Sequence, residues 1–302
     1  MTEMTNDILP AGIQAITRLP NASLRNLWQS IFISDDVRQK LVAQAVLNFT
    51  ARPKIGREVL PLHGVILLAG PPGTGKTSLA KGLANEVCEI FGRDDFQMVE
   101  VEPHGLTSSG MGKTQRAVAQ LFAQTISELA STGPTVVVLD EVETLAVDRS
   151  KLSLDANPVD IHRATDAVLV QLDLLAEAHK NLLFIATSNF PQAVDDAFVS
   201  RCDLVIDVPL PNADGCRQIL EDCLTGLKKT YPKVGRLLAD PDFDETARKF
   251  VGLDGRAIRK TVANALASDR KVAMDPGSVS ISQLSAAADA AKTAKSRDGD
   301  IK

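Results

Sequence analysis

The stretch Gly70-Pro-Pro-Gly-Thr-Gly-Lys-Thr77 decides the fold class of this chain. It follows the apolar run Val65–Ala69 and opens a helical pattern that ends near Phe91. A strand, a glycine-rich loop and a helix in this order form the setting in which G-x-x-x-x-G-K-T binds polyphosphate. Glycines let backbone N–H groups turn toward the anion, and the helix points its positive end at the same anion. The chain is therefore expected to bind a nucleoside triphosphate.

The positions of this motif have separate expected roles. Lys76 is expected to reach the β- and γ-phosphates, and the Thr77 hydroxyl is expected to ligate Mg²⁺. The remaining nucleotide contacts are expected from the rest of the loop and the start of the helix: Gly70, Pro71, Pro72, Gly73, Thr74, Gly75 and Ser78. ATP and Mg²⁺ are thus the expected cofactors.

A second decisive stretch is Pro134-Thr-Val-Val-Val-Leu-Asp-Glu141. Its β-branched run is typical of a strand buried on both faces of a parallel sheet. It ends in two carboxylates at the carboxyl end, where open α/β sheets bind their ligands. We expect Asp140 to hold Mg²⁺ and Glu141 to polarise the water that attacks the γ-phosphate. The alternative, a carboxylate pair capping the next helix, is weakened by the presence of Gly70–Thr77 in the same chain.

Further apolar runs complete a predicted five-stranded parallel sheet, with strands at 97–101, 181–189 and 204–208. The 181–189 strand ends in polar residues, and we expect Asn189 to lie beside Glu141 and to bond the water or the γ-phosphate. After Asn212 the pattern becomes helical, with helices expected near 213–229, 242–251, 255–270 and 280–294. The predicted fold is an α/β three-layer sandwich with a small C-terminal helical domain.

These patterns divide the chain into four parts. We expect a flexible arm at 1–23, an α/β domain at 24–211 that includes an N-terminal linker at 24–60, a helical domain at 212–294 and a disordered tail at 295–302. The arm is either a plain tail or a segment that binds a partner.

Three other features remain, and two of them carry alternative interpretations. The apolar segment Trp28–Ile33, with Ile31 and Phe32, either packs into the core or forms a wall of an adenine pocket. Arg201 is expected to be an exposed arginine on a short helix. Arg256 lies in the first turn of a helix that Asp254 would cap, where a cation opposes the helix dipole. Contact with a phosphate would explain Arg256, and so would a surface ion pair.

Composition limits the remaining function classes. The chain has 302 residues, 44% hydrophobic residues, a formal net charge of −5 and four cysteines without C-x-x-C spacing. The charge argues against a dedicated nucleic-acid surface, and the cysteines indicate neither a zinc site nor a redox pair. The N-terminus is polar and the apolar runs are shorter than a membrane span. We therefore expect a cytoplasmic protein that binds neither nucleic acid nor membrane.

Taken in order, the motifs resemble those of AAA+ ATPases, which have an α/β domain and a helical lid. The motifs are GPPGTGKT, VVVLDE, the T-S-N that ends at Asn189, D-x-A-F-V-S-R-C-D and G-L-D-G-R. Four longer segments are similar to the pachytene-checkpoint family, whose members are hexameric remodellers of HORMA-domain proteins: L-W-x-S-I-x-x-S-D-D-V from Leu27, D-E-V-E-T-L, A-T-S-N and A-F-V-S-R-C-D. The resemblance covers about residues 24 to 270.

The resemblance implies further roles. Arg201 matches the arginine finger that contacts the γ-phosphate of the neighbouring subunit, and Arg256 matches the sensor-2 arginine of the lid. The loop at 108–112 matches the first pore loop, so its residues would contact substrate: Ser109, Gly110, Met111 and Gly112. The loop at 148–159 matches the second pore loop.

Two departures from the family pattern bear on function. Only 27 residues precede Trp28, which is too few for the adaptor domain of the eukaryotic members. In this respect the chain resembles the short bacterial versions from anti-phage operons with nucleotide-signalling enzymes. Met111 also stands where many remodellers have an aromatic residue, although methionine can grip a chain by adaptable apolar contact.

The expected function is an ATP-hydrolysing homo-hexamer that engages a partner's peptide tail and switches a HORMA-domain protein. One alternative is a nucleotide-gated scaffold similar to a clamp loader. Another is a general unfoldase that serves a separate protease, although the chain itself carries no H-E-x-x-H or similar protease motif.

Overall fold

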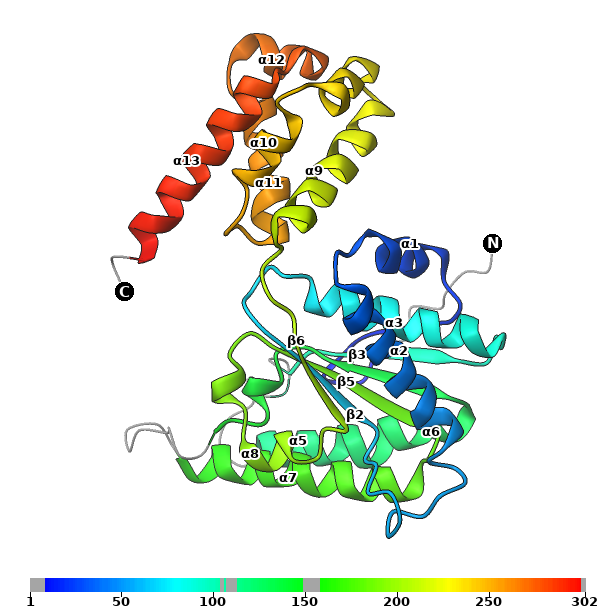
Figure 1. Cartoon of the computed structure of the whole chain (residues 1–302). Coiled ribbons are helices and arrows are strands. Elements are labelled where there is room, and N and C mark those ends of the chain that lie inside the picture. Colours follow the sequence, from blue (N-terminus) through cyan, green and yellow to red (C-terminus); the bar gives the residue numbers. More distant parts are fainter. Residues whose placement is uncertain (1–8, 104–105, 107–112, 149–157, 300–302) are drawn as a thin grey trace. The chain divides into compact units, whose positions relative to one another are not determined.

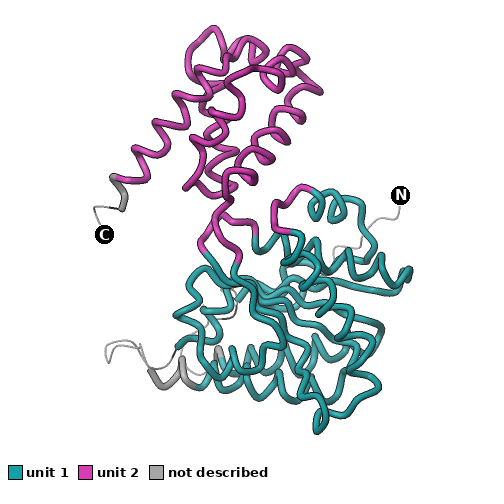
Figure 2. The backbone as a smooth tube through the Cα atoms, in the orientation of Figure 1, with its two compact units in different colours: residues 1–29, 35–70, 76–207 teal, residues 30–34, 71–75, 208–302 magenta. Residues whose placement is uncertain are grey.

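The computed structural model describes residues 9–103, 106, 113–148 and 158–299, and the chain divides into two compact units (Figures 1 and 2). The N-terminal unit comprises residues 1–29, 35–70 and 76–207. The C-terminal unit comprises residues 30–34, 71–75 and 208–302. The phosphate-binding motif is thus shared, because residues 71–75 group with the C-terminal unit while Gly70, Lys76 and Thr77 group with the N-terminal one.

A six-stranded sheet with the order β1-β3-β4-β5-β2-β6 forms the centre of the N-terminal unit. Its strands are β1 (Ile13–Arg18), β2 (Val65–Ala69), β3 (Gln97–Val101), β4 (Thr135–Leu139), β5 (Leu182–Ser188) and β6 (Leu204–Asp207). The five strands from β2 to β6 are parallel, as the sequence predicts. This order places the carboxyl ends of β4 and β2 on either side of β5.

Helices cover both faces of this sheet (Figure 1). The helices α2 (Asp35–Thr50) and α3 (Lys76–Phe91) lie on one face, and α5 (Lys113–Gln120), α6 (Ser127–Thr132) and α7 (Pro158–Ala178) lie on the other. A π-helical segment, Leu121–Ile126, joins α5 to α6. All residues of β2, β4 and β5 are buried, so continuous apolar runs rather than alternating ones encode these strands.

The C-terminal unit contains a helical bundle with its own core. Its helices are α9 (Ala213–Lys228), α10 (Phe243–Arg248), α11 (Gly255–Leu266), α12 (Arg270–Met274) and α13 (Ile281–Gly299), with a 3-10 helix at Pro232–Ala239. The bundle packs leucine, valine and phenylalanine side chains such as Leu220, Phe250 and Leu284, which are fully buried. None of the helices in the described ranges is long and apolar enough to span a membrane.

The structure corrects two expectations about the chain ends. Residues 13–18 do not belong to a flexible arm, because they form β1, which pairs antiparallel with β3 from Ile13 opposite Val101 to Arg18 opposite Gln97. The helix α1 (Ala22–Ser30) follows directly. At the other end, the predicted disordered tail is wrong for residues 295–299, because α13 continues to Gly299.

Candidate active site

The glycine-rich loop lies between the end of β2 and the start of α3. Gly73 and Gly75 adopt positive φ angles of 80° and 92°, a region that side chains with a Cβ rarely enter. A Cβ at Gly73 would also collide with the carboxylate of Asp254, which caps α11. Within the C-terminal unit, the backbone N–H of Arg256 donates to the Gly73 carbonyl at 3.4 Å. Glycine is therefore required at position 73 both by conformation and by the close approach of α11.

Lys76 and Thr77 occupy the first turn of α3. The Lys76 side chain is buried at 4% exposure, and its ammonium donates to the Gly70 carbonyl at 2.9 Å. Burial lowers the pKa of Lys76, and the nearby carboxylates of Glu143 and Asp140 oppose this shift. The Thr77 hydroxyl donates to Oδ1 of Asp140 at 2.8 Å. Both polar groups therefore point toward the end of the sheet where the β4 carboxylates lie.

The carboxylates at the end of β4 belong to a hydrogen-bonded network with β5. The Thr187 hydroxyl donates to Asp140 Oδ1, and it accepts the backbone N–H of Glu141 at 3.2 Å. The side-chain amide of Asn189 donates to Glu141 Oε1 at 3.2 Å. Asn189 and Glu141 therefore lie side by side, as the sequence predicts.

Glu141 has an unusual backbone. It is the one described non-glycine residue with a positive φ, at φ 51° and ψ 54°. Such left-handed conformations at non-glycine residues are strained and concentrate at functional sites. Glu141 precedes the 3-10 helix Val142–Thr144, but its side chain makes no capping hydrogen bond to it. The helix-capping alternative for this carboxylate is therefore not what the structure shows.

Two residues of this network escaped the sequence interpretation. In the sequence, Thr187 is only one of the polar residues that end the strand, although it is 2% exposed and links Asp140 to Glu141. Glu143 accepts the backbone N–H of Asn189 at 3.1 Å, and its other carboxylate oxygen is buried without a hydrogen-bond partner. Their partners lie 46 or 47 positions away along the chain, so local patterns could not reveal them.

Arg201 differs from its expectation. It follows α8 (Asp196–Val199), and its guanidinium forms a two-pronged ion pair with Asp173 of α7. Its side chain is only 23% exposed. The expectation of an exposed arginine is therefore wrong, because Asp173, 28 positions away in sequence, contacts the Arg201 guanidinium.

The candidate adenine-binding segment divides between the two units. Trp28 is 5% exposed and packs against Gly82 of α3 in the N-terminal unit, which agrees with the core alternative for this residue. In the C-terminal unit, Ile31 lies beside Gly75, and the Phe32 ring packs against Gly215 of α9. The adenine role of Ile31 and Phe32 stays a prediction.

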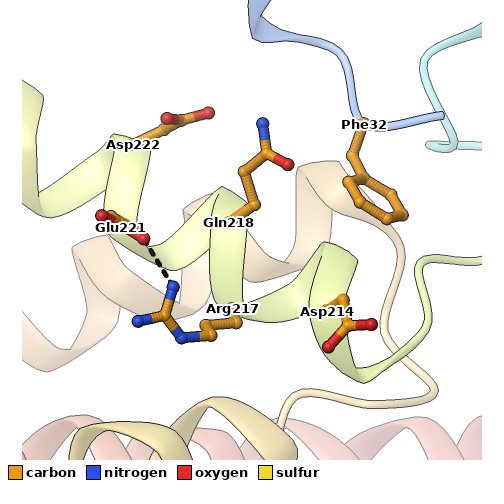
Figure 3. Close-up of a pocket in the computed structure, with 6 residues that line it drawn as sticks. All are labelled: Phe32, Asp214, Arg217, Gln218, Glu221 and Asp222. Carbon is orange, nitrogen blue, oxygen red and sulfur yellow. Dashed lines mark hydrogen bonds and ion pairs between the residues drawn. The ribbon is translucent and has the colours of Figure 1, made fainter. Parts of the chain in front are cut away.

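A cavity of about 480 Å³ lies next to Phe32 in the C-terminal unit (Figure 3). One face of α9 supplies the rest of its lining: Asp214, Arg217, Gln218, Glu221 and Asp222. Arg217 donates to Glu221 and to Asp244, each at 2.8 Å. A planar base needs apolar walls, so the polar lining makes this cavity a poor candidate for the adenine slot.

Arg256 is exposed at the start of α11, which Asp254 caps by accepting the Ala257 N–H at 2.9 Å. Contact of Arg256 with a phosphate stays a prediction. The expected substrate-contacting residues of the first pore loop, Ser109 to Gly112, and positions 149–157 of the second lie outside the described residues.

Comparisons with known proteins agree with this geometry. The model of the ATPase family associated with various cellular activities (AAA) matches residues 66–210. CD-NTase-associated protein 6 of Pseudomonas aeruginosa is 62% identical over 291 residues, 96% of each chain. The pachytene checkpoint protein 2 homolog of Rattus norvegicus is 31% identical over 285 residues, which cover 86% of this chain and 65% of that protein.

Two solved structures share the fold. A chain of the E. coli MS115-1 HORMA:CdnC:Trip13 complex has a TM-score of 0.73 at 17% identity, covering 92% of this chain and 94% of that one. The C. elegans PCH-2 structure has a TM-score of 0.73 at 24% identity, covering 97% of this chain and 78% of that one. At these identities the likeness concerns the fold.

Proposed function

We propose that this chain, which belongs to the AAA ATPase family, is a hexameric ATPase that remodels a HORMA-domain protein. It matches a CD-NTase-associated protein over nearly its whole length. Nucleotide binding and ATP hydrolysis follow from the family. The hexameric ring, the HORMA-domain partner and the roles of individual residues are proposals.

One observation carries the catalytic part of this proposal. Thr77, Asp140, Thr187, Glu141 and Asn189 form a continuous hydrogen-bonded chain across the carboxyl ends of β4 and β5 and the start of α3. Such a chain fixes the orientation of a carboxylate before substrate arrives, which is how preorganised sites lower a barrier. Glu141 is the member whose carboxylate would orient and polarise the attacking water.

The donor set also suits a magnesium nucleotide. Mg²⁺ prefers hard oxygen ligands and is usually bound by one or two protein groups plus the substrate phosphates. Thr77 and Asp140 offer a hydroxyl and a carboxylate oxygen 2.8 Å apart. Within the described ranges no group of three or more acidic, histidine or cysteine side chains forms an all-protein metal site. When bound, the ion would neutralise charge that develops on the phosphates.

Lys76 would bind the β- and γ-phosphates directly. Its ammonium is held by the Gly70 carbonyl at the base of the loop, so its position is set before the nucleotide binds. We assign to Arg256 of the helical lid a second positive charge that, beside Lys76, faces the phosphates from the same protomer. We assign to Arg201 of a neighbouring protomer the positive charge that reaches the phosphates in trans. Arg201 in trans is the assignment that requires a ring.

The proposed partner follows from the relatives. A 62% identical protein is named for its association with a CD-NTase, and a fold neighbour lies in a complex that includes a HORMA protein. We propose that the ring, acting in the cytoplasm, engages a HORMA protein's peptide tail through the loop around Met111. Switching the HORMA protein would in turn regulate a nucleotide-signalling anti-phage system.

Glu141→Gln tests the catalytic assignment. The variant should bind ATP with near-normal affinity, keep its oligomeric state and lose hydrolysis, because the amide cannot accept a proton from water. Thr144→Ser, on the same turn, is the matched control and should hydrolyse ATP normally. Substantial ATP turnover by the Glu141→Gln variant would refute the assignment of Glu141 as the residue that polarises the attacking water.

The partner is tested with the same trapped variant. A purified HORMA-domain protein should copurify with Glu141→Gln protein in the presence of ATP and be released in ADP. Met111→Ala should keep basal ATPase activity but lose remodelling. Unfolding of any tagged protein would instead favour the general unfoldase, and ATP-gated DNA binding would favour the clamp-loader-like scaffold.

A further inference from the structure

The guanidinium of Arg201 is held along one edge by the carboxylate of Asp173. Nε of Arg201 lies 3.1 Å from Oδ1 and Nη2 lies 2.7 Å from Oδ2, which is the parallel two-bond geometry of a strong arginine–carboxylate pair. Nη1 donates to the Ala197 carbonyl at 2.7 Å. Three of the five N–H donors of the fork are used in this way. Among the residues that the structure describes, one N–H on each Nη atom has no acceptor and is available for an anion.

Asp173 is charged and is contacted by a histidine and a second arginine. His63 Nε2 lies 3.4 Å and Arg57 Nη2 lies 3.8 Å from Asp173 Oδ1, and Arg57 contacts His63 at 2.7 Å. Burial acts to raise the pKa of Asp173, but the bond and charge of Arg201, followed by His63 and Arg57, lower it overall. The carboxylate is therefore anionic at neutral pH, and Arg201 and Arg57 keep it in place.

The backbone beside Arg201 is anchored as well. Asp203, two residues further on, accepts the backbone N–H groups of His63, Gly64 and Val65 at 2.8, 2.6 and 3.2 Å. This carboxylate ties the segment after α8 to the loop that enters β2. Both the main chain and the side chain of Arg201 are thus restrained, at a cost in side-chain entropy.

We propose that Asp173 is the positioning residue for Arg201, orienting the outer edge of the guanidinium toward the nucleotide of a neighbouring protomer. This inference rests on the proposed trans role of Arg201. A planar fork binds phosphate oxygens well only when its plane is correctly set. Asp173 sets this plane by holding the opposite edge, and it leaves the outer N–H groups available.

The first test compares steady-state ATPase kinetics of three variants. Asp173→Asn keeps the shape but replaces one acceptor oxygen with a donor that faces Arg201, so kcat should fall about tenfold while the KM for ATP stays near that of the unaltered protein. Arg201→Ala should lose more. Glu177→Gln, one turn along α7 and 69% exposed, removes the same charge and should stay within twofold. Asp173→Glu, which keeps the charge but shifts the fork, should be intermediate and serves if Asp173→Asn does not fold.

The second test is rescue in trans, which a merely structural role would not give. Glu141→Gln protomers have an inactive site but an intact Arg201, so mixing them with Asp173→Asn protomers should raise the ATPase rate per Asp173→Asn protomer. Glu141→Gln/Arg201→Ala protomers should give no such rise.

The outcomes separate the inference from the function on which it rests. Two results would overturn only the positioning role of Asp173. One is a normal kcat for Asp173→Asn when Arg201→Ala is inactive. The other is a loss of activity in Asp173→Asn that Glu141→Gln protomers do not rescue. Normal activity of Arg201→Ala would instead refute the trans role of Arg201, on which the positioning role of Asp173 also depends.

Discussion

Replacing Thr187 with valine removes one hydroxyl from the centre of the candidate active site. Valine has nearly the same shape as threonine, and the side chain is 2% exposed, so packing should be preserved. Two interactions disappear: the hydrogen bond to the Asp140 carboxylate and the bond from the Glu141 N–H at 3.2 Å. The substitution therefore loosens both carboxylates at the end of β4 without touching the phosphate-binding loop.

The size of the effect follows from the bonds that are lost. A hydrogen bond to a charged group contributes about 1.5–3 kcal/mol. If all of this appears in the barrier to hydrolysis, the rate falls about 10- to 150-fold. The Thr77 hydroxyl still holds Asp140 at 2.8 Å, which favours the lower half of that range. Because Lys76 keeps its position, we expect the loss in kcat rather than in ATP affinity.

The assay is steady-state phosphate release across a range of ATP concentrations, with ATP affinity measured separately on the Glu141→Gln background. Thr187→Ser is the matched control, since it retains the hydroxyl and should keep most of the activity. A Thr187→Val protein that hydrolyses ATP within twofold of the unaltered protein would refute the reasoning. Equal losses in the serine and valine variants would show that the loss is not specific to the hydroxyl.

Three further predictions concern affinity, stability and pH. Gly73→Ala should weaken ATP binding at least tenfold by calorimetry, because alanine is strained at φ 80° and its Cβ meets Asp254; unchanged affinity would contradict this. Arg52→Met should lower the free energy of unfolding by about 3 kcal/mol, because the buried guanidinium donates to the Leu182 and Ala176 carbonyls and its removal leaves them unpaired; a melting temperature equal to that of the unaltered protein would count against it. Burial is the largest cause that lowers the pKa of both His63 and His179 below 6.5. The unfolded chain therefore binds protons more readily than the folded chain, and stability should fall as pH drops below 6.5. Thermal melts at pH 7.5, 6.5 and 5.5 should show this fall, and it should flatten in a His63→Gln/His179→Gln variant; equal slopes would argue against these histidines as its source.

The parallel strands were predictable because each is a continuous apolar run buried on both faces. The strand β1 was not, because its partner residues in β3 lie 79 to 88 positions later and the flanking Pro10, Gly12 and Pro20 resemble a loop. Its burial alternates, with Ile13 buried and Ile16 exposed at the sheet edge, which is a weaker signal than a continuous run.

The same distinction applies to the candidate site. Roles for motif residues such as Lys76 and Asp140 could be predicted because their neighbours in sequence define the motifs. Thr187, Glu143 and Asp173 act through partners on other strands and helices, so their contribution depends on packing that no local pattern records. The pairing of Arg201 with Asp173 was missed for this reason.

The left-handed backbone of Glu141 has a consequence for how this protein tolerates mutation. A non-glycine residue in that conformation costs about 1–3 kcal/mol, and glycine at position 141 would relieve it. Glu141→Gly should therefore melt at a higher temperature than the active protein while hydrolysing no ATP. Selection for heat resistance alone would favour inactive variants here, so the site trades fold stability for catalysis at a single residue.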